Sequence, residues 1–252
     1  MKNLSKIIKI PKKISLNQIK EYFKKYNLFN KIENNNLFPP NLIDLYRIHQ
    51  FIILNNRTSV LEFGCGWSSL IILHALNENL KKNKIIDSLK YEFEILENGK
   101  KYLNHCRKRN NKIKNNKIKT KYIYSKCHWI EFNNRISSSY NRIPLINPNF
   151  IYLDGPDPSS VLFKSQKLKK NKNADLMPMS CDILKIEYNL IPGTIILIDG
   201  RTNNANFLKN NFKRNWLYFH DLENDQSIFY LNDLPLGVRN INQLKFFKKK
   251  YK

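Results

Sequence analysis

The stretch Val60-Leu-Glu-Phe-Gly-Cys-Gly-Trp-Ser-Ser69 decides the fold of this chain. Its first residues form an apolar run that is typical of a buried strand. The run leads straight into a tight Gly-X-Gly turn, and a helical pattern begins at Trp67. A strand followed at once by a helix belongs to a parallel sheet that is covered by helices.

Short apolar runs alternate with helical patterns along the rest of the chain. Residues 194–199 (Thr-Ile-Ile-Leu-Ile-Asp) are apolar almost throughout and rich in β-branched side chains, as in a strand buried on both faces. The alternation predicts a doubly wound α/β fold with a mostly parallel seven-stranded sheet. The predicted strands are residues 58–63, 88–93, 121–125, 150–154, 194–199 and an antiparallel pair at 216–221 and 227–231; the predicted helices are 67–77, 95–107, 175–190 and 204–212.

The chain is predicted to have three regions. Residues 1–57 form a helical N-terminal extension, in which Ser15 and Asn41 are the helix N-caps. Residues 58–235 form the α/β domain, and residues 236–252 form a basic C-terminal tail. The extension shows no catalytic motif, so we expect it to pack against the α/β domain.

The composition excludes several classes of protein. Hydrophobic residues make up 42% of the chain, which is enough for a packed core. The chain contains no run of about 18 apolar residues, so no transmembrane helix is predicted. Lysines interrupt the apolar residues near the N-terminus, so no signal peptide is predicted. The 4 cysteines are widely spaced without a CxxC pair, which argues against disulfides or zinc. We expect a cytoplasmic protein with reduced thiols.

The formal net charge of +24 comes from 44 Lys and Arg against 20 Asp and Glu. Such a charge occurs in proteins that bind nucleic acid or anionic membranes. Asn, Ile and Lys are all abundant here and have A/T-rich codons, so a biased genome explains the charge without such a partner. The basic runs at residues 107–121, 164–172 and 245–252 fall in predicted loops and ends, where charges are usually solvated. We therefore do not favour a nucleic-acid partner.

The glycine turn is suited to bind a ligand with its backbone. Gly64 and Gly66 permit a positive φ and a close approach of the ligand. The following helix offers free amide groups and the positive end of its dipole, and Ser68 is placed to help cap it. Such a turn holds a pyrophosphate or an amino-acid carboxylate. The strict dinucleotide fingerprint has Gly or Ala where this chain has Ser69.

Carboxylates near predicted strand ends add to this pattern. Glu62 lies two residues before the first glycine, and Glu92 lies near the end of the second predicted strand. A carboxylate at that strand end can accept both hydroxyl groups of an adenosine ribose. Glu94 is a second candidate. Alternatively, Glu92 and Glu94 start a helix, where acidic residues interact well with the dipole.

These features resemble the class I S-adenosylmethionine-dependent methyltransferases. The resemblance rests on the segments LEFGCGWSS, KYEFE, FIYLDGPDP and TIILIDG and covers most of the α/β domain. It implies a Rossmann-like methyltransferase fold with S-adenosyl-L-methionine as the cofactor. In that family the glycine loop holds the methionine part, the second-strand acid holds the ribose, and the fourth strand ends at the methyl-transfer site. The matching residues here are Glu62, Gly64, Gly66, Glu92 and Asp154.

The residues after the third strand flank the adenine in that family. Here they are Lys126, Cys127 and His128, and none of them matches the adenine position securely. Among the five histidines of the chain, His128 is the best placed for a role in cofactor binding.

Two predicted strand ends carry Asp-Gly pairs, at Asp154 and Asp199, and Arg201 follows the second pair. Ligands bind at the carboxyl ends of strands in open α/β sheets. Either aspartate is therefore a candidate general base toward a substrate hydroxyl, and Arg201 is a candidate clamp for a carboxylate or phosphate. Alternatively, both pairs form turns in which the aspartates accept backbone hydrogen bonds, and Arg201 lies on the surface.

The same aspartates offer a candidate Mg²⁺ site, with Asn203 or Asn204 adding an oxygen. This is similar to the Mg²⁺-dependent small-molecule O-methyltransferases, in which Asn directly follows the second Asp. Here Gly200 follows it, so we do not predict a metal.

The predicted function is methyl transfer from S-adenosyl-L-methionine to a small-molecule or glycan-precursor substrate. Three alternatives remain. The charge alone favours a nucleic-acid methyltransferase, a nicotinamide-dependent oxidoreductase is weakened by Ser69, and a non-catalytic binding module would keep the cofactor fold without turnover.

Overall fold

The computed structural model describes residues 4–29, 39–83, 86, 88–113, 116–157, 160–163 and 179–249. Its centre is a seven-stranded sheet with the strand order β3-β2-β1-β6-β8-β10-β9. Only β10 runs antiparallel to its neighbours, β8 and β9. The predicted doubly wound, Rossmann-like α/β fold with a mostly parallel seven-stranded sheet is confirmed. The strands are β1 (Ser59–Phe63), β2 (Glu92–Glu97), β3 (Lys119–Tyr124), β6 (Phe150–Leu153), β8 (Ile195–Asp199), β9 (Trp216–Asp221) and β10 (Gln226–Leu231).

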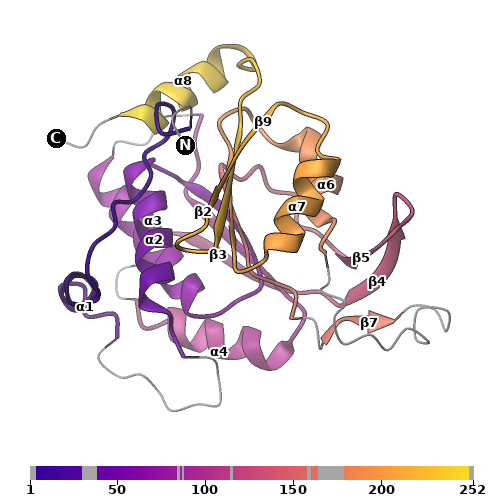
Figure 1. The fold of residues 1–252 in the computed structure, drawn as a ribbon. Coiled ribbons are helices and arrows are strands. Elements are labelled where there is room, and N and C mark those ends of the chain that lie inside the picture. Colours follow the sequence, from indigo (N-terminus) through magenta and orange to yellow (C-terminus); the bar gives the residue numbers. More distant parts are fainter. Residues whose placement is uncertain are drawn as a thin grey trace.

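Helices cover both faces of this sheet (Figure 1). Side chains of a central strand alternate between two cores: Ile195 and Leu197 belong to one, and Ile196 and Ile198 belong to the other. This alternation explains why the strand is apolar at every position from Ile195 to Ile198. The first core contains α2 (Leu42–Leu54), α3 (Trp67–Lys82) and α4 (Lys100–Asn110); the second contains α6 (Asp182–Ile186) and α7 (Thr202–Asn211).

The N-terminal extension contributes α2 to the first of these helical layers, and its helix α1 (Leu16–Lys24) packs on the outside of α2. Ser15 caps α1 by accepting a hydrogen bond from the Gln18 amide, and Asn41 caps α2 in the same way. Both predicted N-caps are therefore confirmed. The extension is thus helical, as expected, and α1 lies against α2.

A chain of polar side chains ties α1 to α2 and α3 inside this layer. The hydroxyl of Tyr22 lies 2.6 Å from Nδ1 of His49, and Nε2 of His49 lies 2.9 Å from Nδ1 of His74. Gln50 also donates a hydrogen bond to the Tyr22 oxygen at 2.8 Å. Burial lowers the pKa of both histidines, that of His74 to about 4.

The sequence pattern did not predict a second, three-stranded sheet with the order β5-β4-β7. It contains β4 (Cys127–Phe132), β5 (Arg135–Tyr140) and β7 (Leu162–Phe163). Asn133 and Asn134 connect β4 to β5, and both have a positive φ. Asn-Asn is a weaker hairpin signal than Asn-Gly, which explains why the hairpin was missed.

The C-terminal part also differs from expectation. Within the expected basic tail, α8 (Gly237–Lys248) packs on the body of the protein through Phe246 and Phe247. The predicted helix at 175–190 begins outside the described residues, and its described part contains α6 and η2 (Glu187–Asn189). The basic run at 164–172 also lies outside the described residues. Among the described helices, none is long and apolar enough to cross a membrane.

Candidate functional site

The turn after β1 is in close contact with the turn after β6. Gly64 has a φ of +87°, and a Cβ atom on it would lie 2.8 Å from the amide nitrogen of Gly155. A Cβ atom on Gly155 would lie 2.5 Å from Cα of Gly64. Both distances are shorter than real Cβ contacts, so neither position has room for a side chain. This contact brings the glycine turn beside Asp154.

Gly66 has a different role from Gly64. Its φ is −169°, which is extended backbone that any residue adopts, so the expectation of a positive φ at Gly66 is wrong. A Cβ atom there would meet nothing closer than the Ser68 hydroxyl at 3.9 Å. Gly66 precedes α3 and lines a cavity. A glycine at this position keeps space open next to the helix N-terminus.

Glu62 supports the glycine turn from beneath. Its carboxylate is fully buried and accepts hydrogen bonds of 2.6 Å from both the Ser68 and the Ser69 hydroxyl. Burial raises the pKa of Glu62 well above its usual range. Ser68 therefore donates to Glu62 and shows no side-chain hydrogen bond to the α3 backbone, which differs from the predicted cap. Glu62 is not among the residues that line the cavity, so it positions the turn.

Glu92 does not lie where the sequence pattern placed it. β2 begins at Glu92, which pairs with Ser59 at the amino end of β1 and accepts a hydrogen bond from its hydroxyl at 3.1 Å. The predicted position of Glu92 at the carboxyl end of this strand is therefore wrong. Glu94 is buried inside the strand and is paired with Lys121.

Glu97 occupies the carboxyl end of β2 instead. One of its oxygens accepts a hydrogen bond from the Cys65 amide at 3.0 Å, and the other accepts one from the Gly99 amide at 2.7 Å. Glu97 thus connects the glycine turn to the start of α4, and burial raises its pKa. The signal that could have found it is the Asn98-Gly99 pair, because Asn-Gly marks the end of a strand.

His128 is also placed differently from expectation. It lies inside β4, where it pairs with Ser139 of β5 and Leu162 of β7. The predicted loop after the third strand is only two residues long, Ser125 and Lys126. His128 lines neither of the two cavities described below, so the structure does not bring it together with the glycine turn.

A cavity of about 410 Å³ opens above the glycine turn, and we call it the glycine-turn cavity. Its walls come from the turn, from Glu97, from one face of α4, from the end of β6 and from the start of α2. The guanidinium group of Arg109 lies 4.0 Å from the centre of the Trp67 ring, and both side chains line the cavity. Other lining residues are Gly64, Cys65, Gly66, Ser68, Tyr102, His105, Cys106, Asp154 and Asp157.

A second cavity of about 610 Å³ adjoins the first, and we call it the acidic cavity. The two share wall residues from α2, from the end of β6 and from the end of β8. Five carboxylates and one guanidinium group line the acidic cavity. The carboxylates belong to Asp44, Asp154, Asp199, Glu223 and Asp225, and the guanidinium group belongs to Arg201.

Burial and repulsion between neighbouring carboxylates both raise pKa values in the acidic cavity. The pKa of Asp154 is raised to about 7, mainly by burial and also by the charge of Asp199, against the lowering effect of Arg201. The side chain of Asp154 is nevertheless 55% exposed to the cavity, so water and a substrate can reach it. Burial and the charges of Asp199 and Asp154 likewise raise the pKa of Asp44 to about 7.

Asp199 and Arg201 are held in place by neighbouring groups. Asp199 accepts hydrogen bonds from the Tyr152 hydroxyl at 3.0 Å and the Gln226 amide at 3.2 Å. Arg201 donates to the backbone oxygens of Asp154 at 2.6 Å and Pro156 at 2.9 Å. Its guanidinium group therefore braces the turn after β6. The structure thus brings the three predicted catalytic residues Asp154, Asp199 and Arg201 to one edge of the sheet.

The sequence pattern missed Asp44, which reaches both cavities from α2 of the extension. Its sequence position offers no signal of such a role, because only the packing of α2 on the sheet brings it there. Within the described part of the chain, no three His, Cys, Asp or Glu side chains are arranged to hold a metal ion.

No protein-family model matches the sequence, and no curated protein matches it. Solved structures that resemble this fold include an O-methyltransferase from Bacillus cereus in complex with SAH, at 13% identity and a TM-score of 0.39, covering 92% of this chain and 96% of that chain. A 16S rRNA methyltransferase from T. thermophilus in complex with AdoMet and guanosine has 11% identity and a TM-score of 0.45, covering 81% of this chain and 45% of that chain. The human methyltransferase 10 domain containing protein has 13% identity and a TM-score of 0.42, covering 86% and 96%. Likenesses this low do not transfer a function.

Proposed function

We propose that this chain is an S-adenosyl-L-methionine-dependent methyltransferase that acts on a small molecule. The observation that carries the proposal is the position of Glu97. Its carboxylate lies at the carboxyl end of β2, is bonded to the amide of Cys65 inside the glycine turn, and faces the same cavity as that turn. A carboxylate beside a glycine turn is suited to accept ribose hydroxyls while the turn approaches the rest of the ligand.

The residues of the glycine-turn cavity fit such a cofactor. Its volume of about 410 Å³ lies within the range of small-molecule sites. Gly66 and Ser68 line it at the N-terminus of α3, where amide groups and the helix dipole favour a carboxylate such as that of methionine. Trp67 and Tyr102 add aromatic surface. Glu97, Gly64, Gly66 and Ser68 would hold the cofactor, which supplies an electrophilic methyl group.

The acidic cavity is the proposed place of the methyl acceptor. Asp154 lies in the walls of both cavities, and its pKa of about 7 suits a general base that takes a proton from a hydroxyl or amino group near neutral pH. Asp199, held by Tyr152, orients the acceptor from the next strand. Arg201 keeps the turn that carries Asp154 in position. Proximity and orientation supply the remaining acceleration.

The charge of this cavity supports a small acceptor over a nucleic acid. Five carboxylates line it, although the chain has only 20 acidic residues against 44 basic ones. Carboxylates repel a phosphate backbone, whereas they interact well with hydroxyl and amino groups. A glycan precursor or another small molecule with such groups fits the cavity.

Calorimetry with S-adenosylmethionine, S-adenosylhomocysteine, NAD and NADP, each titrated alone, tests the proposal. We expect the two sulfur compounds to bind and to raise the melting temperature by mass action on the folded state. Binding of NAD or NADP without binding of the sulfur compounds would favour an oxidoreductase and overturn the proposal. RNA and DNA oligonucleotides at physiological salt are the second arm, and tight, sequence-selective binding would favour the nucleic-acid methyltransferase.

A further inference from the structure

The outer surface of residues 234–249 combines exposed aliphatic and basic side chains, and we call it the α8 face. Four aliphatic side chains within eight residues are exposed: Leu234 by 86%, Leu236 by 62%, Val238 by 73% and Ile241 by 38%. The basic side chains of Arg239, Lys245, Lys248 and Lys249 are exposed as well. Along α8, positions 238, 241, 245 and 248 follow helical spacing, so they share one side of the helix.

The opposite side of α8 is firmly attached to the protein. Phe246 and Phe247 are buried, and the guanidinium group of Arg57 lies 4.4 Å from the centre of the Phe247 ring. The Asn240 side chain donates to the Pro192 oxygen at 3.1 Å, and Gln243 donates to the Ser88 oxygen at 2.7 Å. The exposed aliphatic residues are therefore presented by an anchored helix.

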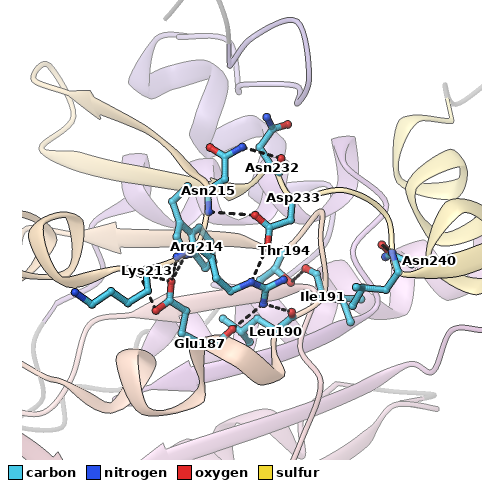
Figure 2. A network of polar contacts seen from close by, with 12 residues as sticks. Glu187, Leu190, Ile191, Thr194, Lys213, Arg214, Asn215, Asn232, Asp233 and Asn240 are labelled. Carbon is cyan, nitrogen blue, oxygen red and sulfur yellow. Dashed lines mark hydrogen bonds and ion pairs between the residues drawn. The ribbon is translucent and has the colours of Figure 1, made fainter.

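The segment that leads into α8 is anchored too (Figure 2). The Arg214 side chain donates to the carboxylate of Asp233 at 2.7 Å, and the backbone amide of Asn215 donates to the same carboxylate at 3.1 Å. The guanidinium group of Arg214 also donates to the backbone oxygens of Glu187 and Leu190. Asp233 and Asn240 thus fix the two ends of the short segment that exposes Leu234 and Leu236.

The charged residues of the C-terminal segment itself, residues 234–252, all have one sign. Residues 234–252 contain six Lys and Arg and no Asp or Glu. The N-terminal segment lies beside α8 (Figure 1), where Lys9 donates to the Lys249 oxygen at 3.3 Å. Part of the net positive charge of the chain therefore lies next to the exposed aliphatic side chains of the α8 face.

We propose that the α8 face binds the surface of a lipid bilayer that contains anionic lipids. Leu234, Leu236 and Val238 would enter the headgroup region, and the neighbouring lysines would interact with the negative lipids. Anionic lipids complement the basic residues, and a bilayer accepts aliphatic side chains. A nucleic acid would instead use aromatic side chains for stacking, and the exposed apolar residues here are all aliphatic.

This binding leaves both cavities accessible. Leu244 of α8 packs on Gly193, which precedes β8, and Gln243 contacts Ser88, which precedes β2. The α8 face therefore lies at the amino ends of the strands, whereas the cavities lie at their carboxyl ends. The inference does not depend on the proposed methyltransferase activity.

Cosedimentation of the full chain with lipid vesicles tests the proposal. One set of vesicles contains phosphatidylcholine alone, and the other contains phosphatidylcholine mixed with phosphatidylserine. We expect binding to the mixed vesicles only. Lys245→Gln together with Lys248→Gln should weaken it by about 25-fold, since each lysine near an anionic surface contributes about fivefold.

A triple variant with Leu234→Ser, Leu236→Ser and Val238→Ser tests the aliphatic part and should lose most of the binding at physiological salt. The matched controls are Leu145→Ser, at a leucine that is 98% exposed, and Lys20→Gln with Lys24→Gln on α1, and they should bind as the wild type does. Urea unfolding checks that each variant is folded. Equal binding to both kinds of vesicle, equal losses in the controls, an unchanged triple variant, or tight RNA binding without vesicle binding would overturn the proposal.

Discussion

Gly64 and Gly155 pack backbone against backbone, and a Cβ atom on Gly155 would lie 2.5 Å from both Cα and the amide nitrogen of Gly64. This contact joins the turn after β1 to the turn after β6. The first turn lines the proposed cofactor cavity, and the second carries Asp154, the proposed general base. Because neither glycine has a side chain, the two turns can pack backbone against backbone, and this contact positions the cofactor cavity next to Asp154.

Gly155→Ala should lower the free energy of unfolding by about 3 kcal/mol, because overpacking against backbone is at the upper end of its usual range. Gly64→Ala should cost at least as much, since its positive φ adds about 1–2 kcal/mol. Gly66→Ala is the control and should cost no more than about 1 kcal/mol, because its Cβ atom meets nothing within 3.4 Å. Urea unfolding measures all three, and equal losses would contradict the contact.

Glu97→Gln should weaken the binding of S-adenosylhomocysteine by about 10- to 100-fold. The reason is that hydrogen bonds to a charged acceptor contribute about 1.5–3 kcal/mol. Glu92→Gln should leave the affinity unchanged, because Glu92 lies at the other end of β2. Calorimetry gives both affinities. A loss in the Glu92 variant with normal binding in the Glu97 variant would place the ribose elsewhere.

His74 should make the protein less stable at acidic pH. Its pKa is about 4 in the folded protein and about 6.5 in the unfolded chain, so the unfolded chain binds more protons between these values. Stability should therefore fall as the pH decreases from 7 to 4.5, and His74 should account for about 2–3 kcal/mol of the loss. In His74→Asn, whose side-chain amide can still form a hydrogen bond with His49, the loss should be smaller by that amount. Identical pH profiles from urea unfolding would rule this out.

Asp44→Asn should stabilise the protein at pH 8. The carboxyl group has a pKa of about 7 in the folded protein, so at pH 8 it is charged beside Asp199 and Asp154. The gain should be about 1 kcal/mol, because Asp44 is only half-buried and water screens the repulsion. It should shrink as the pH falls through 7 and vanish below about pH 3, where the carboxyl group is neutral in both the folded and the unfolded state. Glu21→Gln on the surface of α1 is the control, and a gain that persists undiminished at about pH 3 would point to another cause.

The sequence by itself determined the sheet and the main turn. A strand with consecutive apolar residues predicted burial on both faces, and the structure shows it at Ile195 and Ile196. The helix N-caps at Ser15 and Asn41 could also be predicted from the sequence, because a cap is made by a side chain and a backbone amide two or three residues away. The turn at Gly64 could be predicted as well, because its geometry depends on neighbouring residues in the sequence.

The tertiary structure decided which residues meet at the site. Glu92 and Glu97 flank the same buried run, and only the pairing of β2 with β1 determines which of them lies beside the glycine turn. Asp44 reaches the cavities because α2 packs on the sheet, and α8 is held by contacts with residues from before β1, β2 and β8. Local propensity places residues along a strand or helix, but the register between strands and the packing of helices depend on contacts between distant segments, which the order of residues does not state.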